Sequence, residues 1–160
     1  MIRSLRILVR LAAIGASFFA MENLSIRPYM ANRVLRRVDT RTHAAAADPN
    51  SQRAVIRARI SMNELGTISD IQKDEVNYEM LFAANARLLN RPGDALAHYD
   101  TALRFDHRPE IYLERGATLL ELGRDSEAIA NFVLAAEFDP DIVETLDPPI
   151  RARVVAQLRG

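Results

Sequence analysis

The feature that most constrains this chain is an internal repeat with a period of 33 residues. When residues 76–108 are laid against residues 109–141 without any insertion, eight positions are identical. The identical pairs are Ala84/Ala117, Leu89/Leu122, Arg91/Arg124, Ala95/Ala128, Ala97/Ala130, Ala102/Ala135, Phe105/Phe138 and Asp106/Asp139. A repeat of this length indicates stacked supersecondary units, each of which buries its apolar face against its neighbours.

Within 109–141, the spacing of apolar residues predicts two helices joined by a tight turn. Helical intervals separate Ile111, Tyr112, Leu119 and Leu122, and again Ala128, Ile129, Phe132 and Ala135. Gly123 is placed to end the first helix, and Asp125 or Ser126 to cap the second. The Asp-Pro pair at 139–140 should end that second helix. We expect a hairpin whose small residues at 116, 128 and 135 permit close approach, with Phe132 filling the space between the helices.

This pattern resembles the tetratricopeptide repeat. The resemblance depends on Tyr112-x2-Arg115-Gly116-x2-Leu119, Ala128-x3-Phe132, Ala135 and Pro140, and in the earlier copy on Phe82-Ala83-x2-Ala86, Ala95-x3-Tyr99-x2-Ala102-Leu103. Arg115 stands where the family usually has leucine, and Glu79 where it has a bulky residue. The resemblance covers two units, 76–108 and 109–141. It implies an all-α fold, a short solenoid of helical hairpins.

The segments on either side of the repeats are expected to act as caps, because the ends of a stack must differ from its interior. Residues 50–75 resemble the first helix of a further unit that does not complete the pattern, so we predict a degenerate capping hairpin. We expect Ser69 or Asp70 to begin one long helix that runs to about Leu89. Residues 142–160 predict a capping helix that begins after Asp147. Its apolar residues should cover the last repeat: Ile150, Val154, Val155 and Leu158.

Charge is divided unequally along the chain, although the net charge is zero. Residues 1–59 carry eleven arginines and three acids, a balance of +8, whereas residues 60–160 have a balance of −8. Two parts of a chain that differ this much in charge are expected to have different roles.

Residues 1–28 combine a basic start with an uncharged run from Leu11 to Met21. A membrane-spanning helix needs about 20 residues, but snorkelling by Arg10 and Glu22 can extend the span to about residues 5–26. We therefore predict a signal anchor or transmembrane-like helix, with a single span. The alternatives are a cleaved secretory signal, a mitochondrial targeting segment, and an amphipathic helix packed on the protein's own core. Arginines flank the run on both sides, so the positive-inside rule does not decide the orientation. We favour the extracytoplasmic side for the rest of the chain.

Residues 29–49 predict a basic amphipathic helix followed by a linker. Its arginines are expected to contact anionic lipid headgroups or an acidic neighbouring protein. They are Arg33, Arg36, Arg37 and Arg41. A nucleic acid is not expected as partner, because no interleaved aromatic residues or known binding module accompany the arginines.

The resemblance also implies a concave groove lined by the first helix of each unit. The groove positions carried over to this chain are Asn77, Met80, Arg87, Glu110, Leu113, Leu120 and Glu121. The apolar members suit a short helix or an extended apolar peptide, with Arg87 and Glu121 orienting it. The Lys-Arg-Asn clamp by which some family members hold chaperone tails is missing here, which disfavours that role. In an alternative arrangement, the amino-terminal hairpin or the final helix fills the groove.

Catalytic machinery is not evident in the sequence. The chain has no cysteine, and its three histidines, at 43, 98 and 107, lack metal-ligand spacing. There is no glycine-rich phosphate loop and no nucleophile elbow. We therefore expect no enzyme, no catalytic, cofactor-binding or metal-binding residue, and no cofactor. The sequence predicts a membrane-anchored adaptor or scaffold that binds a protein partner, as a subunit of a membrane complex. The alternative is a soluble exported or organellar interaction or chaperone-like module formed after signal cleavage.

Overall fold

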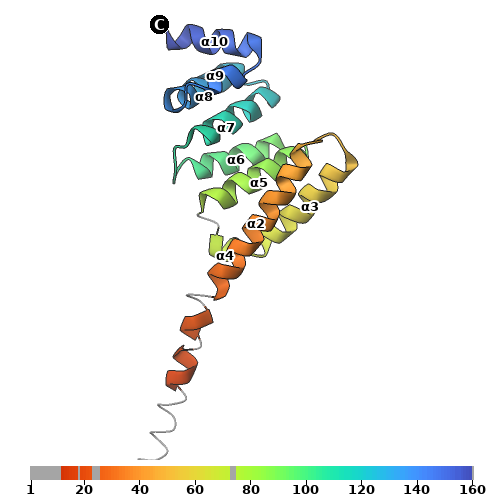
Figure 1. Cartoon of the computed structure of the whole chain (residues 1–160), viewed down its shortest axis with the longest axis vertical. Coiled ribbons are helices and arrows are strands. Elements are labelled where there is room, and N and C mark those ends of the chain that lie inside the picture. Colours follow the sequence, from red (N-terminus) through yellow and green to blue (C-terminus); the bar gives the residue numbers. More distant parts are fainter. Residues whose placement is uncertain (1–11, 18, 23–25, 73–74, 160) are drawn as a thin grey trace, which may run out of the picture.

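The computed structural model describes residues 12–17, 19–22, 26–72 and 75–159. Regular structure in these residues is helical throughout, which confirms the all-α prediction. The helices are α2 (Arg27–Ala46), α3 (Gln52–Gly66), α4 (Ser69–Gln72), α5 (Val76–Leu88), α6 (Pro92–Ala102), α7 (Pro109–Glu121), α8 (Asp125–Phe138), α9 (Ile142–Thr145) and α10 (Pro148–Leu158). Figure 1 shows them stacked along the long axis of the molecule, with the short helical pieces before α2 leading away from the stack.

The two repeat segments each form a helical hairpin, α5 with α6 and α7 with α8, and α6 packs on α7 to join them. The alanines predicted to lie between helices are fully buried: Ala95, Ala102, Ala128 and Ala135. A Cβ atom added to Gly116 would lie 2.7 Å from Cε1 of the buried Phe132 ring. Only glycine therefore lets the ring reach the backbone of α7, which confirms that Phe132 fills the space between the two helices.

Both hairpins turn through a left-handed residue after the first helix. Gly123 has a φ of +70°, and Asn90 takes the equivalent place with a φ of +57°. In the second hairpin, the N–H of Arg124 donates to the carbonyl of Leu119, and the N–H of Gly123 to that of Leu120, each at 2.9 Å. This pair of bonds is the Schellman motif, and it satisfies carbonyl groups that the end of α7 would otherwise leave open.

The cap predicted for α8 is wrong. Arg124 is the N-cap residue, without a side-chain capping bond, and Asp125 is the first residue of the helix. The Schellman bond uses Arg124 immediately after the turn, so α8 begins before an Asp125 or Ser126 cap could form. Asp125 and Glu127 lie instead in the first turn, where the helix dipole favours acidic side chains.

The amino-terminal region is a third hairpin. We predicted α3 as the first helix of an incomplete unit, but it packs on α2 and is the second helix of a pair. Arg41 of α2 donates to Glu64 of α3 at 3.1 Å. The buried Asn85 of α5 donates to Thr42 of α2 at 2.8 Å, which fixes this hairpin against the first repeat. The residues predicted as a basic helix and linker thus form the core-packed partner of α3.

The long helix predicted from Ser69 or Asp70 to about Leu89 is also wrong. Helix α4 ends at Gln72, and Glu75 has extended backbone angles, with φ −105° and ψ 126°. The Glu75 carboxylate accepts a bond from the N–H of Tyr78 at 3.2 Å and caps the start of α5. Glutamate is not among the preferred N-cap residues, so the sequence carried no clear signal of this break.

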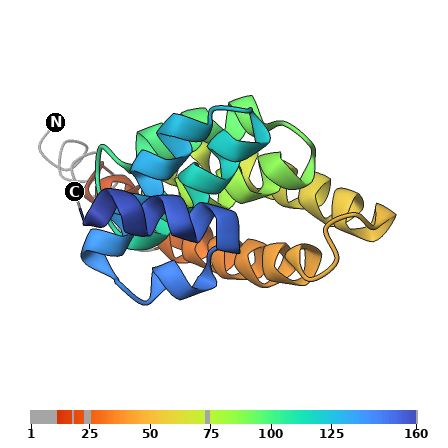
Figure 2. The ribbon, with the colours of Figure 1, turned by 90° about the horizontal axis from the view of Figure 1, so that it is seen from above.

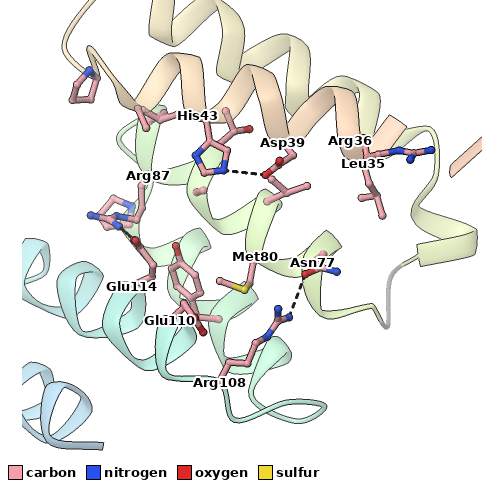
Figure 3. A pocket seen from close by; sticks show the side chains of 18 of the residues that line it. Leu35, Arg36, Asp39, His43, Asn77, Met80, Arg87, Arg108, Glu110 and Glu114 are labelled. Carbon is pink, nitrogen blue, oxygen red and sulfur yellow. Dashed lines mark hydrogen bonds and ion pairs between the residues drawn. The ribbon is translucent and has the colours of Figure 1, made fainter. Parts of the chain in front are cut away.

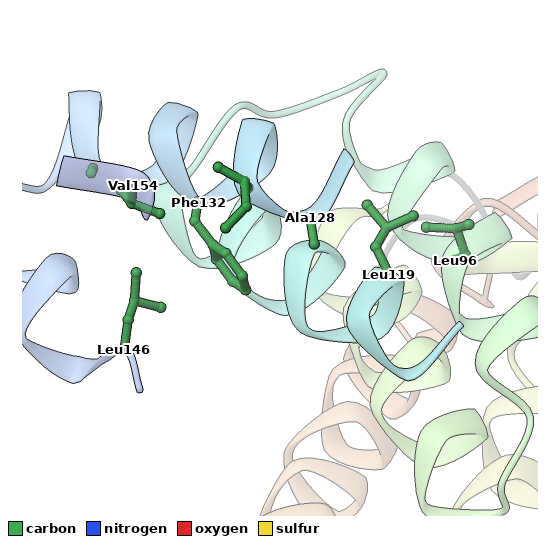
Figure 4. Packing of buried hydrophobic residues seen from close by; sticks show 8 residues of the cluster. Leu96, Leu119, Ala128, Phe132, Leu146 and Val154 are labelled. Atoms are coloured by element: carbon green, nitrogen blue, oxygen red, sulfur yellow. The ribbon is translucent and has the colours of Figure 1, made fainter. Parts of the chain in front are cut away.

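At the carboxy-terminal end, α10 begins directly after Asp147, as predicted. Val154 is buried in a cluster with Phe132 and Leu146, which Figure 4 shows running from α10 toward α6. Ile150 packs against this cluster, whereas Leu158 is 43% exposed and does not help to cover the repeat. Figure 2 looks onto this end of the stack and shows α10 lying over the helices behind it.

Candidate binding groove

The first helices of the three hairpins, α2, α5 and α7, line an open groove with a volume of about 1610 Å³ (Figure 3). Helix α5 supplies its floor with Met80, Ala84 and Leu88. Charged side chains come from the two helices on either side, with Arg36, Asp39 and His43 from α2, and Glu110, Glu114 and Glu121 from α7. The groove therefore has an apolar floor between two charged walls.

Arg87 joins the floor to the α7 wall. Its Nε and Nη2 atoms donate to one carboxylate oxygen of Glu121, at 3.0 and 2.6 Å, and its Nη1 atom donates to Glu114. Burial alone would lower the pKa of Arg87, but the bond to Glu121 and the charge of Glu114 outweigh it and raise the pKa. The guanidinium therefore remains charged and links the two repeats across their interface.

Tyr99 of α6 lies beneath this network at the floor of the groove. Its side chain is buried, and its hydroxyl has no hydrogen-bond partner among the described residues. Burial, strengthened by the negative charge of Glu114, raises the pKa of the Tyr99 hydroxyl above its ordinary value.

At the other end of the groove, Arg108 pairs with Asp106 at 2.8 Å and donates to the side-chain oxygen of Asn77 at 3.2 Å. Glu110 is exposed on the α7 wall nearby, and Met80 points into the space between α5 and α7 (Figure 3). On the α2 wall, the Nε2 atom of His43 lies 3.2 Å from a carboxylate oxygen of Asp39.

Five of the seven predicted groove residues line this groove: Asn77, Met80, Arg87, Glu110 and Glu121. Arg87 and Glu121, however, bind each other and do not stand free to orient a ligand. The prediction is wrong for Leu113 and Leu120, which pack against the cluster formed by α8 and α10. They turn away because α7 belongs to the last repeat, whose carboxy-terminal side is covered by the capping helix.

Sequence reasoning missed the whole α2 wall, together with Glu114, Arg108 and Tyr99. Glu114 could have been found, because it lies four residues after Glu110 and seven before Glu121, on one face of a helix. The α2 wall could have been suspected from apolar residues at helical intervals. Those positions are Ala31, Leu35, Val38 and Ala45, all of them buried.

The four arginines assigned to one anionic surface do not share a surface. Arg36 lines the groove. Arg37 and Arg41 reach Glu64 of α3, at 3.8 and 3.1 Å, and Arg33 is exposed. Arg36 and Arg41 are five residues apart, which places them about 140° apart around the helix. Arg36 therefore faces the groove, whereas Arg41 faces α3.

A buried contact outside the groove explains the unusual residue of the first repeat. Nδ1 of His98 lies 2.6 Å from the carboxylate of the buried Glu79, and the His98 ring stacks on Phe82 with centroids 4.3 Å apart. A polar partner within hydrogen-bond distance thus allows Glu79 to occupy a position where the tetratricopeptide pattern has a bulky residue.

The span predicted over residues 5–26 lies partly outside the residues that the structure describes. Within the described ranges, no helix combines the length and the apolar character needed to cross a bilayer. Comparison of the chain with models of known protein families and with curated protein sequences finds no match.

Proposed function

We propose that this protein is a tetratricopeptide-type adaptor that holds a peptide segment of a protein partner in the groove between α2, α5 and α7. Three helical hairpins in succession, each contributing its first helix to one open groove, support the proposal. The buried Gly116–Phe132 contact and the 33-residue repeat support the family assignment.

The size of the groove is the observation that carries the proposal. At about 1610 Å³ it exceeds the roughly 300–1,000 Å³ typical of small-molecule sites. A peptide helix or an extended segment suits a groove of this size and openness. Met80, Ala84 and Leu88 offer it an apolar strip, and the charged walls offer orientation.

The ionisable groups of the groove favour binding over catalysis. Arg87 is held by two glutamates, His43 by Asp39, and Arg108 by Asp106. Side chains that are already paired with one another at the surface give a ligand directional contacts but no obvious nucleophile or general base. We therefore propose a non-enzymatic role without a cofactor or a metal.

We further propose that residues 1–28 attach the adaptor to a membrane, as one subunit of a larger assembly. The described part of this segment supports the idea, because Ile14 and Met21 are 65% and 52% exposed on helical pieces that lead away from the stack. Exposed large apolar side chains in this position suit a lipid environment.

A peptide-selection experiment tests the groove. Peptides selected on the full-length protein should bind it with a measurable Kd by fluorescence anisotropy. The variant Met80→Glu should weaken that binding about tenfold or more, because it places a charge on the apolar floor. The control Leu134→Glu alters an apolar side chain of α8 that does not line the groove, and should bind normally. Peptides that bind Met80→Glu as well as the original protein would place the binding site elsewhere.

A fractionation experiment tests the anchor. Full-length protein expressed with its amino terminus should remain in membranes washed with alkaline carbonate. The alternative, a soluble exported or organellar module, predicts release by the wash and a new amino terminus near residue 20, which amino-terminal sequencing detects.

A further inference from the structure

Five large apolar side chains are exposed on the α2–α3 hairpin, and none of them lines the groove. They are Ile26, Tyr29 and Met30 at the start of α2, and Ile56 and Ile60 in α3, each 42–61% exposed. Surface apolar residues that occur singly need no explanation, but a cluster of them indicates an interaction site.

On α2, the exposed apolar residues and two arginines form one stripe. Ile26, Tyr29, Met30, Arg33 and Arg37 recur at intervals of three and four residues. The buried residues of the helix follow a different stripe at 31, 35, 38, 42 and 45. The exposed stripe is therefore turned outward from the hairpin core.

A second stripe runs along α3 with Arg53, Ile56 and Ile60, opposite the buried residues at 54, 58, 61 and 65. The turn between the helices places Ile56 and Ile60 beside the second half of α2, whereas the exposed apolar residues of α2 lie at its start, with Arg33 and Arg37 between the two groups. Arg37 of the first stripe lies 3.8 Å from Glu64, one turn after Ile60, and Arg57, next to Ile56, donates to the carbonyl of Ala44 at 2.7 Å. Together they form what we call the outer face, defined by Ile26, Tyr29, Met30, Arg33, Arg37, Arg53, Ile56 and Ile60.

The outer face is basic. Five exposed arginines lie on it or beside it: Arg33, Arg37, Arg53, Arg57 and Arg59. Of the acids that border it, Glu64 is paired with Arg41, and Asp70 with Arg27, which leaves Asp48 in the turn between α2 and α3. Positive charge therefore predominates beside the exposed apolar side chains.

We propose that the outer face binds the surface of a bilayer that contains anionic phospholipids. Arginines beside Ile, Tyr and Met side chains are the composition of helices that lie in the interface plane, with the apolar groups among the acyl chains and the charges at the headgroups. The proposal rests on the membrane association proposed above and adds a second contact, made by the folded hairpin and separate from residues 1–28.

A bilayer fits this face better than the acidic carboxy-terminal half of a second copy. The exposed apolar side chains continue along the chain from Met30 to Met21 and Ile14, beyond the folded stack. A lipid surface can accept all of them at once, because it needs no complementary shape. A second copy would need one apolar surface that matches the whole row of side chains in shape.

The test uses the full chain, whose lack of cysteine allows single-site labelling. Ile56→Cys, labelled with an environment-sensitive fluorophore, is mixed with phosphatidylcholine vesicles with or without phosphatidylglycerol. We expect a blue shift only with phosphatidylglycerol, reversed by salt because of screening. The same label at Leu134→Cys, on α8, should not shift.

Charge reversal checks that the arginines are responsible. Arg33→Glu combined with Arg53→Glu should raise the lipid concentration needed for the Ile56 shift about 25-fold or more, since each basic residue near an anionic surface contributes about a fivefold factor. The matched control reverses Arg104 and Arg159, two exposed arginines outside this face, and should leave the shift unchanged.

Three results would overturn the proposal. The label at 56 could remain unshifted while carbonate-resistant protein sediments with the vesicles, which would leave the anchor intact and remove the lipid contact of the hairpin. The shift could appear equally with uncharged vesicles. It could also appear without vesicles and grow with protein concentration, which would identify a second copy as the partner. A salt-reversible shift in protein that carbonate releases would support the outer face and contradict the anchor.

Discussion

The hairpins α5–α6 and α7–α8 share a left-handed turn residue and a buried aromatic ring, but they use different side chains for them. In the second, Phe132 packs directly on Gly116, and Gly123 supplies the left-handed turn. In the first, the equivalent residues are Tyr99, Ala83 and Asn90. The comparison teaches that the repeat keeps a small residue, a buried aromatic ring and the sign of one backbone angle, whereas the identity of the ring and of the turn residue varies.

The two hairpins also differ in the polar contacts that they make. The second hairpin uses Arg115, which donates to Asp100 of α6 at 2.7 Å and to Asn131 of α8 at 3.0 Å, so one guanidinium joins three helices. The equivalent residue of the first hairpin is Phe82, stacked on His98. Polar contacts thus hold α7–α8 to α6, whereas the aromatic contact at the equivalent position joins α5 to α6.

The largest expected loss of stability comes from removing the Phe132 ring between α7 and α8. Phe132→Ala should lower the free energy of unfolding by about 3–5 kcal/mol, because a buried aromatic ring leaves a cavity at the α7–α8 interface. Urea denaturation followed by circular dichroism measures it. A loss below about 1 kcal/mol would mean that the ring does not hold the hairpin together.

The next prediction concerns the small residue that differs between the repeats, which is Gly116 in α7 and Ala83 in α5. Gly116→Ala should cost about 1–3 kcal/mol, because the new Cβ would lie 2.7 Å from the ring of Phe132. The reciprocal change in α5, Ala83→Gly, should cost only about 1 kcal/mol through helix propensity. Thermal unfolding of both variants gives the comparison, and equal losses would contradict it.

The two buried rings, Tyr99 and Phe132, should also respond differently to alkaline pH. Burial raises the pKa of Tyr99 above the value of the unfolded chain, so the neutral form is favoured in the folded state. Its contribution to stability is present below about pH 10 and is lost as the pH rises further. Between pH 9 and pH 11, the free energy of unfolding should fall by about 1.4 kcal/mol more for the wild-type protein than for Tyr99→Phe. Chemical denaturation at each pH measures this difference. A parallel loss in both proteins would show that Tyr99 is not shielded.

The smallest effect concerns the turns. Gly123→Ala should cost about 1 kcal/mol, because its φ of +70° strains a residue with a Cβ atom. Gly123→Asn introduces the residue type that α5–α6 has at Asn90, and it should cost less because asparagine tolerates this conformation. Chemical denaturation ranks the two, and the reverse order would mean that Asn90 owes its conformation to other contacts.

The repeat region could be predicted from sequence because its information is local and present twice. Gly116, Gly123 and Phe132 each have a physical role that the 33-residue comparison exposes. The break at Glu75 could not be predicted in the same way, since a glutamate cap gives no strong signal. The pairing of α2 with α3 depends on buried contacts between distant residues, such as Asn85 with Thr42, that no local pattern contains.

The candidate groove was predicted where it depends on the repeat, and missed where it depends on tertiary packing. Met80 and Glu110 follow from their place in each unit. Leu113 and Leu120 were misplaced because the position of α10 decides which side of α7 is covered. The arginines of α2 were grouped by composition, although the helix sends Arg36 and Arg41 in different directions.

Helix α2 begins beside the amino-terminal segment and ends as one wall of the groove. A helix of 20 residues is about 30 Å long and behaves as a stiff rod. The Asn85–Thr42 bond fixes that rod to α5 near its far end. A displacement of the near end would have to overcome the packing of Ala31, Leu35 and Val38, and it would then change the width of the space available to a bound peptide.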